Sequence, residues 1–266
     1  MRLIVTRPAA QAGAWVAALQ ALGCHAQALP LIAIAPLADS APARAAWQAL
    51  PRYTLVMFVS ANAVQHFFAL APSAPTAPWP AGVRAGATGP GTAAALRAAG
   101  VPEGALVEPT ADATRFDTEA LWAQVAHEDW AGRQALVVRG EDGRDWLADT
   151  LRARGATVDF VAAYRRLAPQ PDAAGRALLA QALAHPTRHL WLFSSSEALA
   201  NLQALAPGAD WSRSGALATH PRIAAAVRAA GCAQVGLAAP TIAAVAHAAA
   251  IWPSGLAWPS IQSGAL

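Results

Sequence analysis

Two stretches of the sequence decide the fold: LVMFVSANAVQHFFAL at residues 55–70 and LWLFSSSEALANLQAL at residues 190–205. Aligned without a gap, they place Ser60 on Ser195. In both, a continuous apolar run ends at small hydroxyl residues and continues with apolar residues at helical spacing. Such a run is typical of a strand buried on both faces of a parallel sheet, and serine is a favoured helix N-cap. The chain therefore contains the same strand-to-helix junction twice.

The repetition extends along the chain at an offset of roughly 130 residues. IVTRPAAQAGAWVAALQALG, ending at Gly23, parallels LVVRGEDGRDWLADTLRARG, ending at Gly155, and this alignment places Arg7 on Arg139. GPGTAAALRAAG likewise parallels HPRIAAAVRAAG. A single long period indicates a duplicated domain, because the repeats of solenoid proteins are about 20 to 50 residues long.

Strand and helix patterns alternate within each half, which predicts an α/β sheet in each domain. RLIV is expected to form a short apolar strand. In the helix that follows, the apolar residues up to Leu22 should face the core, and the helix should end at Gly23. In the second half, Asp142 and Asp145 are expected to cap the helix that begins near Trp146.

Two extended stretches, 28–37 and 159–169, are predicted to connect the domains. If both cross together, one domain comprises 1–36 and 170–250, the other comprises 37–169, and 251–266 is a mobile tail. Two sequential domains divided near residue 132 fit the same pattern.

Composition excludes several classes of protein. No stretch reaches about 18 strongly apolar residues, and MRLIVTRP is too short for a signal peptide, so we expect a soluble cytoplasmic protein without membrane partners. All 19 basic residues are arginine, which excludes a Schiff-base lysine and a Walker-type phosphate loop. The arginines are scattered and the net charge is only +3, so a nucleic-acid partner is not expected.

Polar residues follow the ends of six predicted strands. In open α/β sheets ligands bind outside the carboxyl ends of the strands, and each of these ends opens a helix whose free N–H groups favour an anion. Helix capping alone is the alternative at any one of them. Together they predict a cleft for a large ligand with many carboxylates or phosphates. The six are Thr6-Arg7, Ser60-Ala61-Asn62, Gly89-Pro90-Gly91-Thr92, Arg139-Gly140-Glu141, Ser194-Ser195-Ser196 and Thr219-His220.

Other patterns are weaker. The glycines before Thr92 faintly resemble a dinucleotide loop, but no acidic residue stands where a ribose partner is expected. His185 and His189 have a ligand-like spacing that Pro186 interrupts, so no metal site is predicted. The two cysteines, Cys24 and Cys232, are interpreted as small residues at strand starts rather than a disulfide.

The ordered set VTRP, FVSANAV, GPGTAAALRAAG, VVRGEDGRDWLADTLRARGATVD, AAYRR and FSSSEAL resembles the uroporphyrinogen-III synthase family over about residues 1–250. The resemblance implies two Rossmann-like parallel-sheet domains, the first assembled from both ends of the chain. It also implies a lyase that closes hydroxymethylbilane, a linear tetrapyrrole with many carboxylates, into uroporphyrinogen III and inverts the terminal pyrrole ring. No cofactor is expected, and we expect a monomer.

The resemblance also assigns residues. Tyr164 matches the family tyrosine proposed to assist departure of the substrate hydroxyl, and Thr92 matches a threonine that lines the cleft. We expect the Tyr164 phenol to face a wet cleft, so that its removal leaves folding unchanged. The substrate-binding candidates are Thr6, Arg7, Ser60, Asn62, Gly89, Thr92, Arg139, Gly140, Ser195, Ser196, Thr219 and His220.

This chain departs from the family where Arg222 and Ile223 replace expected hydroxyl residues, and Thr219 and His220 are candidates to substitute for them. Two other functions compete with the synthase. One is a non-catalytic two-domain binder of an anionic metabolite, and the other is a nucleotide-dependent oxidoreductase built on the glycine loop.

Overall fold

The computed structural model describes residues 1–71, 79–110, 113, 116–141 and 145–252. The chain divides into two compact units: a terminal unit, Met1–Ala33 with the chain from Ala168 onward, and a central unit, Ile34–Leu167. The expected boundaries, after residues 36 and 169, fall two to three residues beyond these. We propose that the two units are the domains of the protein.

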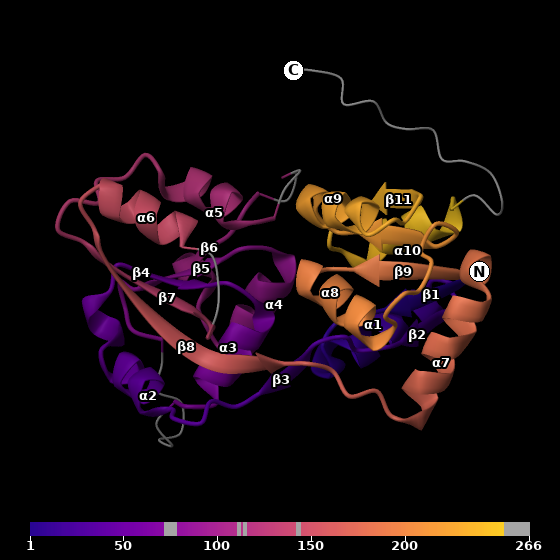
Figure 1. Cartoon of the computed structure of the whole chain (residues 1–266). Coiled ribbons are helices and arrows are strands. Elements are labelled where there is room, and N and C mark those ends of the chain that lie inside the picture. Colours follow the sequence, from indigo (N-terminus) through magenta and orange to yellow (C-terminus); the bar gives the residue numbers. More distant parts are fainter. Residues whose placement is uncertain (72–78, 111–112, 114–115, 142–144, 253–266) are drawn as a thin grey trace. The chain divides into compact units, whose positions relative to one another are not determined.

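The described part of the terminal unit contains a five-stranded sheet in the order β11-β10-β9-β1-β2 (Figure 1). Its recorded strand pairs are parallel. The first two strands come from the start of the chain, and the other three come from its last third. Their bounds are β1 Arg2–Val5, β2 Ala26–Ala28, β9 His189–Phe193, β10 Gly215–Ala218 and β11 Gln234–Leu237.

Helices pack on this sheet because its strands alternate apolar side chains between the two faces. Leu3 and Val5 of β1 contact a cluster that also contains Leu19 of α1 and Val245 of α10. On the other side, α8 and α9 pack against each other and onto β9 and β10. The helices of this unit are α1 Ala9–Ala21, α7 Ala173–Ala184, the 3-10 turn η3 Pro186–Arg188, α8 Ser196–Leu205, α9 Pro221–Ala229 and α10 Ile242–Ala250.

Trp252 corrects the predicted start of the tail. We placed residues 251–266 outside the folded domain, but Trp252 is only 7% exposed and belongs to the same cluster as α1 and α10. A Cβ built on Gly215 or on Gly236 would lie 2.9 Å from its indole ring, so both strands leave room for this side chain. Residues 253–266, the rest of the predicted tail, lie outside the described residues.

The described part of the central unit contains a six-stranded sheet in the order β3-β8-β7-β4-β5-β6. The pairs from β8 to β6 are parallel. The predicted strand TLVMFV is β4, all four of whose residues are buried. The bounds are β3 Ala33–Ala35, β4 Leu55–Phe58, β5 Arg84–Ala87, β6 Leu106–Val107, β7 Gln134–Gly140 and β8 Thr157–Leu167.

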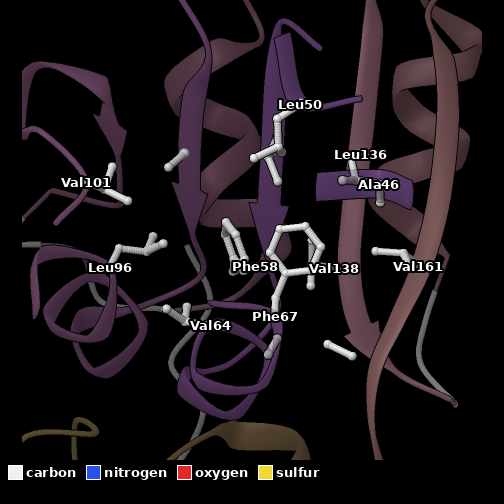
Figure 2. Close-up of a cluster of buried hydrophobic side chains, with 14 of the residues drawn as sticks. Ala46, Leu50, Phe58, Val64, Phe67, Leu96, Val101, Leu136, Val138 and Val161 are labelled. Carbon is white, nitrogen blue, oxygen red and sulfur yellow. The ribbon is translucent and has the colours of Figure 1, made fainter. Parts of the chain in front are cut away.

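Both faces of this sheet are covered. Phe58 of β4 packs with Phe67 of α3 and Leu96 of α4 in a cluster that also includes α2 (Figure 2). The alternate residues of β4, Leu55 and Met57, face a second cluster with α5 and α6. The helices are α2 Ala41–Gln48, η1 Leu50–Arg52, α3 Ala61–Phe68, α4 Pro90–Ala98, η2 Glu103–Ala105, α5 Thr118–Val125 and α6 Trp146–Ala153.

The two sheets repeat one strand order, as a duplication requires. The terminal sheet follows β2-β1-β9-β10-β11, and the matching part of the central sheet follows β8-β7-β4-β5-β6. Apart from the edge strand β3, each half of the chain therefore gives two strands to one sheet and three to the other. This reciprocal exchange explains why a division of the chain near residue 132 does not describe the units.

Some local expectations fail. Leu22 is 57% exposed, because α1 ends at Ala21 and Leu22 already belongs to the turn that leads to Gly23, where φ is 82°. Cys24 and Cys232 are free thiols, as predicted. No helix within the described residues is both long and apolar enough to cross a membrane.

Candidate active site

Three of the predicted junctions follow β4, β5 and β7 of the central unit. These strands run parallel, so their carboxyl ends lie at the same edge of the sheet. Each leads into a helix of eight or nine residues, α3, α4 or α6. The fold therefore gathers these three junctions at one edge.

Ser60 is the N-cap of α3. Its Oγ accepts a hydrogen bond from the backbone N–H of Ala63 at 3.2 Å, which satisfies one of the free donors at the helix start. The same oxygen lies 3.2 Å from Tyr164 Oη. Asn62, one residue into α3, is only 6% exposed. At this junction Ser60, which is half-buried, is the more accessible of the two predicted residues.

Tyr164 lies on β8 and is fully buried, with 0% of its surface exposed. It pairs with Gly140, where a Cβ would lie 3.2 Å from Tyr164 Cζ, and the ring centroid of His66 is 5.8 Å from that of Tyr164. The phenol oxygen contacts Ser60 Oγ and accepts a hydrogen bond from Arg166 Nη2 at 3.3 Å. The expectation that this phenol faces a wet cleft is therefore wrong.

Gly89 is the N-cap of α4 and has an extended backbone. A Cβ there would lie 3.1 Å from Phe116 Cβ, so close packing favours glycine. Thr92 is 6% exposed and lies in the first turn of α4. Thr88, which sequence reasoning did not single out, donates from Oγ1 to the Val59 carbonyl oxygen at 3.2 Å. This bond ties the ends of β4 and β5 together.

Arg139 at the end of β7 already has a carboxylate partner. Its Nη1 forms an ion pair with Asp145, and its guanidinium carbon lies 4.2 Å from the ring centroid of Phe160. Asp145 is the N-cap residue of α6 but its side chain makes no capping bond, so the predicted cap is wrong because Arg139 engages this carboxylate. Asp142, the other predicted capping residue, lies outside the described residues.

In the terminal unit, the junction after β1 consists of Thr6 and Arg7. Thr6 is 1% exposed, and its Oγ1 donates to the Leu192 carbonyl oxygen at 2.6 Å, which ties β1 to β9. Arg7 Nη1 donates to Gln11 Oε1 at 3.2 Å, and its guanidinium carbon lies 3.9 Å above the Trp15 ring.

The positive charge of Arg7 has no recorded counterpart. No ion pair between Arg7 and a carboxylate is recorded among the residues that the structure describes, and its buried Nε has no hydrogen-bond partner. Burial lowers the pKa of Arg7 to about 10, which still leaves the side chain charged at neutral pH. A half-buried cation with an unused donor fits a planar anion such as a carboxylate.

The junction after β9 contains Ser195 and Ser196. Ser195 is the N-cap of α8 and accepts a hydrogen bond from the Glu197 N–H at 3.1 Å. Ser196 is exposed as the first residue of that helix. Both hydroxyl groups are therefore placed at a helix N-terminus, as predicted for an anion contact.

The junction after β10 contains Thr219 and His220, the candidates to substitute for the missing hydroxyl residues. His220 is the N-cap of α9, and its Nδ1 accepts a hydrogen bond from the Arg222 N–H at 3.1 Å. The Thr219 N–H donates to the Phe193 carbonyl oxygen at 3.0 Å. Ile223 is 8% exposed and packs into the unit, so this position serves the core. The imidazole of His220 thus caps α9.

Two more strand ends carry capping residues that the sequence reading did not assign to the site. Thr241 caps α10 after β11, where its Oγ1 accepts from the Ala244 N–H at 3.3 Å. Asp117 caps α5 after β6, where its Oδ1 accepts from the Ala120 N–H at 2.9 Å. The sequence contains a signal for both caps. EPTADATRFDTEAL in the first half of the chain resembles APTIAAVAHA in the second, and each segment has a threonine or an aspartate directly before a helix.

The histidine pair has a structural explanation. His189 Nδ1 lies 2.9 Å from the His185 carbonyl oxygen. Within the described ranges, no group of three or more His, Cys, Asp or Glu side chains is arranged to hold a metal ion.

Comparison with known proteins identifies the family. Residues 13–246 match the family model described as Uroporphyrinogen-III synthase HemD. The uroporphyrinogen-III synthase of Salmonella typhimurium is 33% identical over 178 residues, which cover 67% of this chain and 70% of that protein. The Escherichia coli K12 protein of the same name is 33% identical over 185 residues, covering 68% and 72% of the two chains.

Solved structures share the fold. A mutant uroporphyrinogen III synthase from Thermus thermophilus aligns with a TM-score of 0.56 at 21% identity, covering 91% of this chain and 93% of that one. The enzyme from Helicobacter pylori aligns with a TM-score of 0.55 at 15% identity, covering 94% and 99%. These alignments confirm the α/β class with parallel-sheet domains. Together with the family match, they show that this chain belongs to the uroporphyrinogen-III synthase family.

Proposed function

We propose that this chain is a uroporphyrinogen-III synthase, which cyclises hydroxymethylbilane to uroporphyrinogen III with loss of water and inversion of the terminal pyrrole ring. The observation that carries the proposal is the family match across residues 13–246. We further propose that the enzyme works in the cytoplasm as a monomer and needs no cofactor.

The reaction requires the protein mainly to hold the reacting groups of the substrate in position. Loss of the terminal hydroxyl from the substrate gives an electrophilic azafulvene that the pyrrole nitrogen stabilises. Unaided, this species closes head to tail. The protein must hold a conformation in which the substituted carbon of the terminal ring attacks, so that a spiro intermediate forms, fragments and recloses. Orientation of reacting groups can contribute several kcal/mol to such a step.

The strand-end junctions supply contacts for the substrate carboxylates. Arg7 has the strongest support, because its side chain is half-buried, its Nε has no hydrogen-bond partner, and no ion pair with a carboxylate is recorded for it among the described residues. Ser195, Ser196, Thr219 and His220 offer polar groups at helix starts, where the helix dipole favours anions. Arg139 must first release Asp145, so we assign it a weaker role. Thr6, Asn62 and Thr92 are buried, so we propose that they shape the junctions.

The test is to add freshly prepared hydroxymethylbilane to the purified protein, oxidise the products and separate isomers I and III. A synthase yields isomer III, whereas heat-unfolded protein yields isomer I from spontaneous closure. A non-catalytic binder of an anionic metabolite would retain the substrate, and isomer III would not form.

A further inference from the structure

Three side chains of the central unit form a chain of hydrogen bonds beside the start of α3. Arg166 Nη2 lies 3.3 Å from Tyr164 Oη, and Tyr164 Oη lies 3.2 Å from Ser60 Oγ. Ser60 Oγ also receives the Ala63 N–H at 3.2 Å. The other tyrosine of the sequence, Tyr53, hydrogen-bonds Asp159 in the same unit, so the duplicated junction at Ser195 does not repeat the tyrosine contact.

The direction of these bonds follows from the donor inventory of each group. A guanidinium only donates, so Tyr164 Oη accepts from Arg166. The phenol proton needs an acceptor, since burial without one costs free energy. Among the described residues, Ser60 Oγ is the recorded acceptor within reach. Tyr164 therefore donates to Ser60.

With Tyr164 as the donor, the Ser60 hydroxyl can form only one further hydrogen bond. A serine hydroxyl has two acceptor lone pairs and one proton. Ala63 and Tyr164 occupy both lone pairs, so Ser60 can engage a ligand only by donating its proton to an acceptor atom. Ser60 is half-buried, whereas Tyr164 is fully buried. Of the two hydroxyl groups in the chain, Ser60 is thus the one that a ligand can reach, and the third member, Arg166, is an exposed guanidinium.

We propose that Ser60 donates the hydrogen bond to the departing hydroxyl oxygen of the substrate, and that Tyr164 and Arg166 are positioning residues that act through Ser60. The inference rests on the proposed function and assigns a role to one more residue of that site. It gives Ser60 a role beyond the anion contact that the sequence predicts at this junction.

The step balances without another reactant. The bond between the hydroxymethyl carbon and its oxygen breaks, and both electrons leave with the oxygen. The lone pair of the pyrrole nitrogen forms the double bond of the resulting azafulvenium cation. Ser60 keeps its proton and stabilises the charge on the departing oxygen, which then takes a proton from solvent. Tyr164 and Arg166 polarise the Ser60 hydroxyl and fix its direction.

Kinetics of single and double variants test the proposal. Ser60→Ala should lower kcat by about 10- to 100-fold with little change in KM, at or below the usual range for a lost transition-state donor because the substrate ionises readily. Ser60→Thr, which keeps a hydroxyl, should recover most of the activity. Ser195→Ala is the matched control for loss of a capping serine and should lose far less. Urea unfolding of each variant verifies its fold. If Ser60→Ala does not fold, Ser60→Gly removes the hydroxyl with an N-cap that helices tolerate.

The double variant separates Ser60 from Tyr164. Tyr164→Phe should lose less kcat than Ser60→Ala, and Ser60→Ala with Tyr164→Phe should be no slower than Ser60→Ala alone, since Tyr164 acts through Ser60. Multiplied losses in the double variant, or a larger loss in Tyr164→Phe, would show that Tyr164 itself touches the substrate and would overturn the proposal. If the unmodified protein made no isomer III, the proposed function and this inference would both fall. Isomer III from the unmodified protein with multiplied losses would remove the inference alone.

Discussion

Arg7 and Arg139 occupy duplicated positions in different electrostatic surroundings, and replacing each by methionine should give opposite effects on stability. The Arg7 side chain is half-buried, its buried Nε has no partner, and burial lowers its pKa to about 10. An unsatisfied buried polar group costs about 1–3 kcal/mol, partly offset here by the Trp15 ring 3.9 Å away. Arg7→Met keeps much of the apolar stem, so we expect the free energy of unfolding to rise by about 1 kcal/mol.

The same change at Arg139 removes a bonded group. Arg139 is paired with Asp145 and lies over Phe160, and Asp145 is 51% exposed. Exposed ion pairs contribute about 0–1 kcal/mol, so Arg139→Met should lower the free energy of unfolding by about 0.5–1 kcal/mol. Urea unfolding at pH 7 measures both values.

For substrate binding the order is reversed: Arg7→Met, the stabilising substitution, should weaken binding more than Arg139→Met. If Arg7 binds a substrate carboxylate through charge-assisted bonds, its loss should cost about 1–2 kcal/mol of binding, or about a 5- to 30-fold rise in KM. Arg139→Met should raise KM less, because a ligand must compete with Asp145 for that guanidinium. An Arg7→Met protein that unfolds more easily than Arg139→Met, with an unchanged KM, would refute the assignment of Arg7 as an anion site.

Three further predictions concern stability and reactivity. Burial raises the pKa of Cys232 to about 11 from 9.0, so the folded state holds the thiol proton more tightly than the unfolded state. The free energy of unfolding should therefore fall as pH rises from about 9 to 11, and Cys232→Ala should flatten that decline. A thiol reagent at about pH 8 should modify Cys24 before Cys232. Trp252→Ala should lower the free energy of unfolding by about 3–5 kcal/mol, whereas Ile251→Ala, at a residue 53% exposed, should change it by less than about 0.5 kcal/mol. Arginines beside Glu128 lower the pKa of that carboxylate from 4.5, so Glu128→Gln should cost about 1–2 kcal/mol at pH 7. Because the stabilisation is lost as the carboxylate takes up a proton, the difference from the unmodified protein should shrink as the pH falls below 4.5.

The sequence identified the junctions because their signals are local. A buried apolar run followed by a capping residue predicts a strand end and a helix start, as at Ser60 and Ser195, and both residues cap helices. The family resemblance then supplied the function. Both steps depend on residues that are adjacent in the chain.

The differences between duplicated positions could not be predicted in this way, because they depend on residues that are distant in sequence. Ser60 differs from Ser195 because β8 brings in Tyr164, 104 residues further along the chain. The burial of Tyr164 depends on its register opposite Gly140 at an irregular step of the ladder. Trp252 is buried because two glycines on β10 and β11 leave space for its ring, although it begins a tail-like stretch of sequence.

The ratio of product isomers from a single turnover is the decisive measurement of synthase activity. With the protein in molar excess over hydroxymethylbilane, we expect the fraction of isomer III to rise with protein concentration to a plateau at which isomer I is nearly absent. Formation of isomer I alone, at the spontaneous rate and at every protein concentration, would contradict this expectation.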